Sequence, residues 1–375
     1  MHMHRVGLSL PSRFAVCTNY NCNFLGKKMK RISVCLQFIV LFSASLLANG
    51  PDSLWNPKEK HLQNVKQLTF GGTNAEAYFS FDGKRLIFQS TRSPYDCDQM
   101  FTMNIDGSEQ KLVSTGKGRT TCGYYFPDGK KILYASTHGH ADQCPPRPDK
   151  SKGYVWGVFN DYDIYTSNAD GSDLKLLTAS PGYDAEATIS PKGDKIVFTS
   201  TRDGDLELYT MNLDGSGVKR ITHSLGYDGG AFFSWSGKQI VYRGYHPTDS
   251  AEVREYTSLL AEQLVKPLKM EIFICDADGK NNRQLTNNGN ANFAPFFLPG
   301  DKQIIFASNM KDPKGRFFDL FVIDTDGSGL EQVTFGGHFN AFPMLSSDGK
   351  KIVFVSDRNA KGNYEFNVFV ADWVH

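Results

Sequence analysis

The chain has 375 residues, a formal net charge of +1 and an aromatic content of 13%. This length allows one large domain with small additions. Lys plus Arg (41) and Asp plus Glu (40) nearly balance, which excludes a nucleic-acid groove as the main function, because such a groove needs clustered positive charge. We expect no nucleic-acid partner.

The N-terminal 64 residues carry no repeat, and we divide them into three segments. Residues 1–28 have no usable periodicity and are interpreted as an upstream extension before a start at Met29. Residues 29–48 are predicted to be a signal peptide, because Lys30 and Arg31 precede the apolar run 32–47 and a small residue, Ala48, follows it. That run is short for a membrane-spanning helix, although an uncleaved anchor is the alternative. Residues 49–64 are predicted to be a linker, and the mature chain is predicted to be periplasmic or secreted with no transmembrane segment.

Residues 65–375 repeat the same pattern six times. The first turn of the repeat is Asp82-Gly83-Lys84, recurring as 128–130, 192–194, 236–238, 300–302 and 348–350. The second turn is Asp106-Gly107-Ser108, recurring as 170–172, 214–216, 278–280 and 326–328. A period of roughly 40–50 residues with four short strands per unit is typical of a propeller blade.

The strand count predicts how the ring of blades closes. Each unit holds an apolar run typical of a buried strand: 86–88, 132–134, 196–198, 240–242, 304–306 and 352–354. The sixth unit lacks its fourth strand, whereas Lys66-Gln67-Leu68-Thr69 precedes the first unit without a blade of its own. We therefore predict an all-β, single six-bladed propeller of four-stranded antiparallel blades, in which the N-terminal strand joins the last blade and removes an exposed sheet edge.

Two insertions interrupt the pattern, at 137–160 and 245–269, each between the second and third strands of a blade. These loops and those entering each first strand emerge on the same face, here called the looped face, where function is expected. The second insertion is predicted to contain a helix capped by Asp249, with Val253, Tyr256, Leu260 and Leu264 on one side.

Four cysteines follow the predicted signal peptide. Cys275 lies in an apolar strand and is expected to be a buried free thiol. Export permits disulfides, and we expect one bridge among Cys97, Cys122 and Cys144, whose pairing the spacing does not determine.

One polar residue stands at the same position of every unit, ten residues before the third position of the first turn. These residues are Asn74, Thr120, Asp184, Asp228, Asn292 and Asn340. They predict a ring of oxygen ligands around the channel mouth that would bind a peptide backbone, a sugar or a divalent cation; the alternative is a set of side chains that shape local turns. Glu76, Glu186 and Arg243 complete the predicted ligand-binding set. We otherwise expect no cofactor.

A second series contains mostly basic residues after the second strand, which we expect to pair with acidic or amide residues opening the third strand; contact with a ligand is the alternative. Its members are Arg92, His138, Arg202, His246, Met310 and Arg358, opposite Gln99, Asp163, Glu207, Glu271, Asp319 and Asn367. His138 and His140 are also weak candidates for metal ligands, with Asp142 and Cys144 nearby. A solvated loop is the simpler interpretation.

The units resemble the repeat of TolB-type, WD-like propellers. Ser200-Thr201-Arg202, Glu207-Leu208-Tyr209, Asp214-Gly215-Ser216 and Ile221-Thr222 carry the resemblance best. It covers roughly 65–374, but the α/β domain that precedes the propeller in TolB itself is lacking. The resemblance implies a periplasmic, non-enzymatic protein that binds other proteins; related propellers also gate serine peptidases or bind glycans.

The sequence holds no Gly-x-Ser-x-Gly, His-Glu-x-x-His or phosphate-binding loop. We therefore predict a non-catalytic, monomeric binding module that engages an envelope or secreted protein, a peptide or a glycan on the looped face. The alternatives are a metal-assisted hydrolase or lyase acting on glycans or peptides, using His138, His246, Asp184, Glu186 and Arg243, and an accessory propeller subunit of a separately encoded peptidase.

Overall fold

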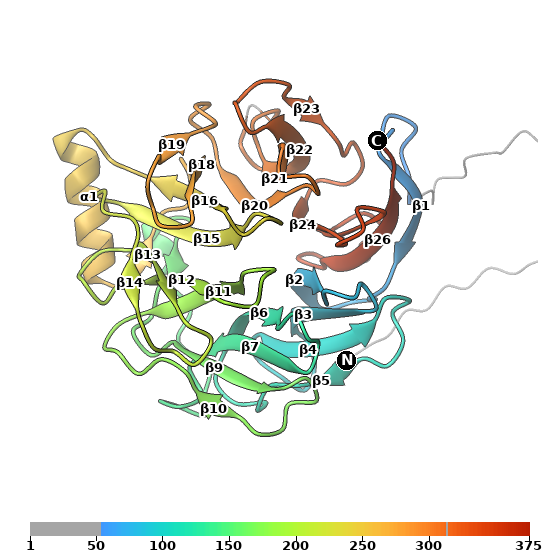
Figure 1. Ribbon diagram of the computed structural model, residues 1–375. Coiled ribbons are helices and arrows are strands. Elements are labelled where there is room, and N and C mark those ends of the chain that lie inside the picture. Colours follow the sequence, from blue (N-terminus) through green and yellow to red (C-terminus); the bar gives the residue numbers. More distant parts are fainter. Residues whose placement is uncertain (1–53, 313) are drawn as a thin grey trace, which may run out of the picture. The chain divides into compact units, whose positions relative to one another are not determined.

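The computed structural model describes residues 54–312 and 314–375. The predicted extension, the signal peptide and part of the predicted linker lie outside these residues. The described part forms six four-stranded antiparallel sheets arranged around one axis (Figure 1). The prediction of a six-bladed, all-β propeller is confirmed.

Each blade runs from an inner strand near the axis to a short outer strand. Blades 1 to 3 consist of β2 (Thr73–Phe79), β3 (Arg85–Thr91), β4 (Gln99–Asn104) and β5 (Lys111–Leu112); β6 (Thr120–Tyr125), β7 (Lys131–Ser136), β9 (Asp163–Asn168) and β10 (Lys175–Leu176); and β11 (Asp184–Ile189), β12 (Ile196–Ser200), β13 (Glu207–Met211) and β14 (Lys219–Arg220). Blades 4 and 5 consist of β15 (Tyr227–Phe233), β16 (Gln239–Tyr245), β18 (Glu271–Asp276) and β19 (Arg283–Gln284), and of β20 (Asn292–Phe297), β21 (Gln303–Ser308), β22 (Asp319–Asp324) and β23 (Glu331–Gln332). The first turn of the repeat joins the first two strands of each blade, as its Asp-Gly chemistry predicts.

Blade 6 confirms the predicted ring closure. Its strands from the chain's C-terminal end are β24 (Asn340–Leu345), β25 (Lys351–Ser356) and β26 (Asn367–Trp373), and β1 (Leu62–Gln67) is its outer strand. Figure 1 shows β1 and β26 side by side, from opposite ends of the chain. β1 begins at residue 62, three residues before the predicted boundary.

The segment before β1 is also packed on blade 6. The described part of the predicted linker therefore contacts the propeller and is not a free connection. Glu59 is fully buried and forms two charge-assisted hydrogen bonds with Arg358, of 2.9 and 3.1 Å. His61 stacks on Trp373 with 5.0 Å between ring centres. These contacts fix the closing strand through side chains as well as through the sheet.

The two insertions meet each other above blade 3. The first contains a short 3-10 helix (Lys150–Lys152) and β8 (Trp156–Gly157), and the second contains α1 (Ser250–Ala261) and β17 (Leu264–Val265). β8 and β17 pair in an antiparallel two-stranded sheet. Asp249 caps α1 as predicted, whereas Leu264 lies in β17 because the helix ends at residue 261. Within the described residues, no helix is long and apolar enough to cross a membrane.

Every inner strand contains a bulge. The pairing between the first and second strands shifts register at the equivalent place in all six blades, after Ala75, Thr121, Ala185, Gly229, Phe293 and Ala341. The bulged residues have a positive φ between 47° and 61°; they are Glu76, Cys122, Glu186, Gly230, Ala294 and Phe342. An extra residue in one strand bends that strand and redirects its side chains.

Aromatic side chains close the channel beneath these bulges. Tyr78 of blade 1 contacts Phe232 of blade 4 across the axis, with 5.3 Å between ring centres, and Tyr124 and Phe296 contact the same Phe232 ring. All four rings are at least 95% buried. The central channel is therefore a pocket with an aromatic floor that opens toward the looped face.

Candidate functional site

The six polar residues predicted to form a ligand ring join neighbouring blades. Each donates its backbone N–H to the carbonyl of the residue before the third strand of the preceding blade, at 2.8–3.0 Å. All six are fully buried: Asn74, Thr120, Asp184, Asp228, Asn292 and Asn340. This burial agrees with the alternative interpretation, in which the six side chains shape the local structure, and that they bind a ligand stays a prediction.

The basic series also has different partners from those predicted. Arg202 binds Asp184 at 2.9 Å, and His246 binds Asp228 at 2.8 Å, so the bonds run to the inner strand of the same blade and not to the residue that opens the third strand. Arg202 also stacks over Tyr209. In blades 1, 3 and 6 the arginine thus forms a structural cluster, because it meets both a buried polar partner and an aromatic face.

The six bulged residues, two positions further along, are the ones that surround the axis. We call Glu76, Cys122, Glu186, Gly230, Ala294 and Phe342 the axial ring. All six line one narrow pocket of about 20 Å³ above the aromatic floor. Glu76 and Glu186 were predicted as ligand-binding residues and lie here together with Arg243; that they bind a ligand stays a prediction.

Glu186 is held by a dense set of donors. Its carboxylate accepts from Thr199 Oγ1 at 2.8 Å, from the Gly230 N–H at 3.0 Å, from the Tyr227 hydroxyl at 3.0 Å and from Arg243. Burial lowers the pKa of the Arg243 guanidinium, but the neighbouring Glu186 and Tyr227 outweigh burial and raise the pKa of Arg243 above its ordinary value. The pair is therefore joined by charge-assisted hydrogen bonds, and of the guanidinium atoms Nε is buried without a partner among the described residues.

Glycines make room for this unit. A Cβ on Gly230 would overlap the Arg243 guanidinium, and one on Gly229 would lie 2.5 Å from the Tyr227 hydroxyl. Gly230 also needs a positive φ of 61°, which glycine adopts without steric cost.

Glu76 has a different environment from Glu186. Its hydrogen-bond partner is the Cys122 thiol, and among the described residues no cation lies within ion-pair distance of it. Burial, reinforced by the charge of Glu186, raises the pKa of Glu76 to about 7 despite the opposing hydrogen bond and the charge of Arg243. Burial and these two carboxylates also raise the pKa of Cys122 well above its ordinary value, so the thiol stays protonated.

Above the axial ring lies a larger cavity of about 420 Å³, which we call the roofed cavity. Part of the blade 2 insertion, including Pro148 and residues 154–158, covers it and forms the roof. The ring of Trp156, in the roof, packs on the ring of Phe293 with 5.1 Å between ring centres. It also faces the Arg243 guanidinium, whose central carbon lies 5.3 Å from the ring centre. Five residues line both cavities and connect them: Glu76, Cys122, Glu186, Arg243 and Phe342.

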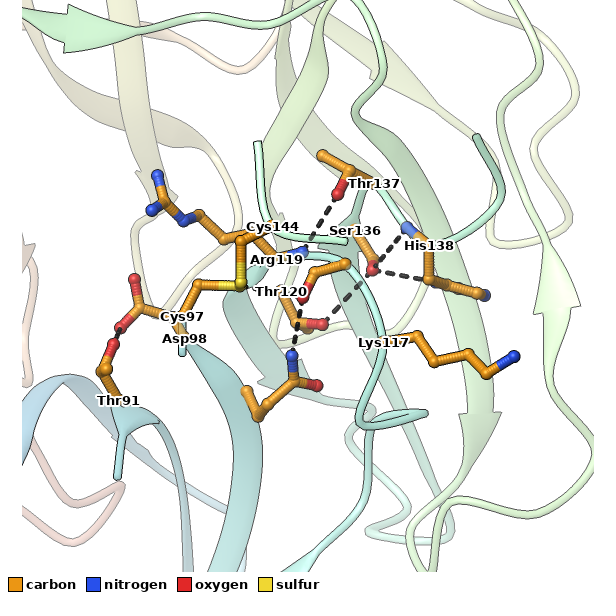
Figure 2. Close-up of a disulfide and its surroundings, with 12 residues drawn as sticks. Thr91, Cys97, Asp98, Lys117, Arg119, Thr120, Ser136, Thr137, His138 and Cys144 are labelled. Atoms are coloured by element: carbon orange, nitrogen blue, oxygen red, sulfur yellow. Dashed lines mark hydrogen bonds between the residues drawn. A yellow bond between two sulfur atoms is a disulfide. The ribbon is translucent and has the colours of Figure 1, made fainter. Parts of the chain in front are cut away.

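Two sets of contacts hold the roof in place. The Cys97–Cys144 disulfide ties the blade 2 insertion to blade 1 (Figure 2). On the other side, β17 of the blade 4 insertion pairs with β8, and the Gln263 carbonyl accepts from the Val158 N–H at 2.8 Å. The bridge is one of the three pairings left open by the sequence; Cys122 is free and lies in the axial ring, and Cys275 is free and buried as expected.

The histidine motif of blade 2 does not form a metal centre. Cys144 is used in the disulfide, His138 bonds Ser136 Oγ through Nδ1 at 2.8 Å, as Figure 2 shows, and His140 bonds Asp163 at 3.0 Å. Across residues 54–312 and 314–375, no three His, Cys, Asp or Glu side chains are placed to hold a metal ion. The side chain of His140 is about half exposed, which agrees with the interpretation of this segment as a solvated loop.

Sequence reasoning missed most of the cavity wall. Tyr227, Phe342 and Trp156 had no assigned role, and Cys122 was considered only as a disulfide partner. Counting back eight residues from the third position of the first turn, instead of ten, reaches the axial ring. The signal is weak because the six side chains at that position are chemically different, whereas the buried polar series is uniform.

Comparison with known proteins assigns the family. A family model described as the TolB beta propeller domain matches residues 147–258 and 255–373. The chain belongs to the TolB beta-propeller family. Its fold is similar to that of a putative TolB from Agrobacterium tumefaciens, with a TM-score of 0.54 at 17% identity over 83% of this chain and 97% of that one.

Two further structures of similar fold have different names. TolB from Acinetobacter baumannii gives a TM-score of 0.53 at 19% identity, over 80% of this chain and 63% of that one. A hydrazine synthase from Kuenenia stuttgartiensis also gives 0.53, at 16% identity over 72% and 40% of the two chains. Because the fold occurs in proteins of such different names, function has to be argued from the site.

Proposed function

We propose that the chain is an exported, non-catalytic binding module that holds a protein, peptide or glycan ligand in the roofed cavity of its looped face. The observation that carries this proposal is the cavity itself. It is concave, has a closed floor, and combines aromatic walls such as Trp156, Tyr183 and Phe318 with a few charged groups. Sites of this size and mixed lining are typical of ligand recognition.

The position of the insertions supports the same proposal. Both large departures from the repeat contribute to the roof or brace it, and Tyr154 of the roof is 62% exposed. A rigid propeller that carries an added, braced roof over one cavity is an arrangement in which selectivity resides in the added part.

The test compares Trp156→Ala with Leu176→Ala on peptide and glycan arrays. Leu176 is 51% exposed on the outer strand of blade 2 and does not line the cavity. We expect the unaltered protein and Leu176→Ala to bind the same members of one array, and Trp156→Ala to lose them. Equal binding by both variants, or no binding by the unaltered protein, would refute the proposal.

One observation favours a catalytic alternative. Glu76 has a pKa of about 7, the range in which a carboxyl group can transfer protons at neutral pH. A hydrolase or lyase acting on glycans or peptides would turn over substrate and lose activity in Glu76→Gln. Absence of product from glycan and peptide panels, with binding retained, would exclude it.

A further inference from the structure

The narrow pocket differs from the roofed cavity in size and in charge. Its volume of about 20 Å³ has room for about one water-sized group, since a water needs roughly 10–15 Å³ on this measure. The roofed cavity above it is about 420 Å³. A ligand of the larger cavity can therefore place only a small terminal group between Glu76 and Arg243.

The charge count around this pocket is unbalanced when Glu76 is ionised. Its charged lining groups are Glu76, Glu186 and Arg243. Arg243 is hydrogen-bonded to Glu186 and Tyr227 and forms no ion pair with Glu76, so its positive charge offsets the negative charge of Glu76 only in part. In the cavity above, Asp98 adds to this negative potential and Arg119 opposes it. With Glu76 and Glu186 beside Asp98, and two arginines, the combined lining has one more acidic than basic group. A buried charge without a counter-charge is costly unless it gains a partner.

The walls that lead to the pocket suit a positively charged group. Aromatic side chains line the roofed cavity, and although the rings of Trp156 and Tyr227 already face Arg243, Tyr183, Phe339 and Phe342 add three further rings. Aromatic faces attract cations, and the attraction grows when the cation is desolvated. A guanidinium or a sugar ring is too large for a pocket that holds one water-sized group, whereas a primary ammonium group is of that size.

We propose that the narrow pocket binds a primary ammonium group, such as the end of a lysine side chain or an alkylamine, whose chain lies in the roofed cavity and whose charge is neutralised by Glu76. This inference rests on the proposed function and names the chemistry of the group that the cavity selects. The bound cation keeps Glu76 ionised, and the Cys122 thiol remains its hydrogen-bond donor.

Protonation of Glu76 couples the site to pH. Burial raises its pKa to about 7. The titratable or charged groups that face it are Cys122, Glu186, Arg243, Asp98, Tyr78 of the pocket floor and Arg119 of the roofed cavity. A bound cation favours the ionised carboxylate, so binding at pH 7 releases about half a proton from Glu76. Affinity for the ammonium group should therefore fall as the pH decreases below 7.

The experiment is calorimetric titration of the full chain with hexylammonium, with 1-hexanol as the uncharged probe of equal length. For hexylammonium we expect a loss of about thirtyfold or more in Glu76→Gln, weaker binding at about pH 5.5 than at about pH 8, and proton release measured with two buffers of different ionisation heat. The matched control Glu109→Gln, in a surface turn, should behave as the unaltered protein. Hexanol binding should be equal in all three proteins, which also shows that the cavity is folded.

The outcomes separate this inference from the proposed function. No hexylammonium binding to the unaltered protein, or equal binding by Glu76→Gln, overturns the ammonium site, and the proposed function still stands if Trp156→Ala loses its array ligands. Loss of hexylammonium binding in Glu76→Gln, with no array ligand for the unaltered protein, supports the ammonium site and refutes the wider peptide or glycan assignment.

Discussion

Two glutamates occupy equivalent positions of the axial ring, yet their environments differ. Glu186 is met by a guanidinium, two hydroxyls and a backbone N–H, whereas Glu76 has a thiol. The difference arises in blade 4, where two consecutive glycines leave space for Arg243 to reach Glu186 across the gap between blades. Small residues in one blade thus decide which donors reach a side chain in the neighbouring blade.

Gly230→Ala should therefore be more damaging than an ordinary glycine substitution at positive φ. The new methyl group would displace the Arg243 guanidinium and disturb its bonds to Glu186. The matched control is Gly129→Ala, which has a similar φ of 67° but no atom within 4 Å of the added Cβ. We expect Gly230→Ala to lose about 1–3 kcal/mol more unfolding free energy than the control, measured by urea denaturation. Equal losses would mean that Arg243 is not confined as described.

The pH dependence of stability should identify Glu76 directly. Burial raises its pKa from 4.5 to about 7, so folding favours the protonated form. Relative to Glu76→Gln, the unaltered protein should keep full stability below pH 4.5 and lose up to about 3 kcal/mol as the pH rises from 4.5 to 7. The comparison uses unfolding midpoints at several pH values, and the Gln variant cancels the contribution of Glu207, whose pKa burial also raises to about 7. A difference that does not change with pH would contradict the buried, only partly compensated state of Glu76.

At the scale of the elements, the repeat predicts strands well and the bulge poorly. Blade number, ring closure and the Asp249 cap follow from turns and apolar runs that recur in the sequence. The inner strand of blade 1 begins at Thr73, and the bulge at Glu76 reverses the alternation of side chains that would mark this strand in the sequence. The bulge position shows no preference for one type of residue that could be recognised in the sequence, since Glu, Cys, Gly, Ala and Phe all occupy it. The ring that faces the axis was therefore assigned two residues too early.

The sequence also could not show that the two insertions pair with each other. Their contact joins residues about one hundred positions apart, Trp156 with Val265 and Gly157 with Leu264, and strands of two residues give no periodic signal. The disulfide is a similar case, because only the fold places Cys97 beside Cys144 and leaves Cys122 in the channel.

Removing the disulfide should loosen the roof and spare the blades. We expect the double variant Cys97→Ala, Cys144→Ala to lose about 2–4 kcal/mol of unfolding free energy and to exchange amide hydrogens faster across residues 145–158. The blade strands β12 and β13 should exchange as before, because they have no contact with the bridge in the sheet. The control is Cys275→Ala, which removes a buried free thiol in blade 4. Unchanged exchange in the roof would show that β8–β17 pairing alone holds it.

At the scale of the whole molecule, ring closure depends on contacts between the two ends of the described chain. β1 pairs with β26 from Leu62↔Trp373 to Gln67↔Phe369. Glu59 satisfies the buried Arg358 guanidinium, and His61 bonds both the Val374 carbonyl and Glu331. The axial cavities need all six inner strands in register, so the closing strand supports a site to which it contributes no side chain.

Deletion of the closing strand should therefore open the ring. A chain of residues 70–375 lacks β1 and leaves the outer edge of β26 unpaired, and such an edge is a template for association with other chains. We expect this variant to form oligomers or aggregates in size-exclusion chromatography with light scattering, and to lose hexanol binding in the roofed cavity. The matched control is a chain of residues 54–375, which keeps β1, Glu59 and His61 and should remain monomeric.

Glu59→Gln separates strand pairing from the ion pair, since it keeps β1 and removes the charge opposite Arg358. This variant should lose about 3 kcal/mol of unfolding free energy without associating. A monomeric 70–375 chain that still binds hexanol would show that five complete blades and a three-stranded sixth suffice.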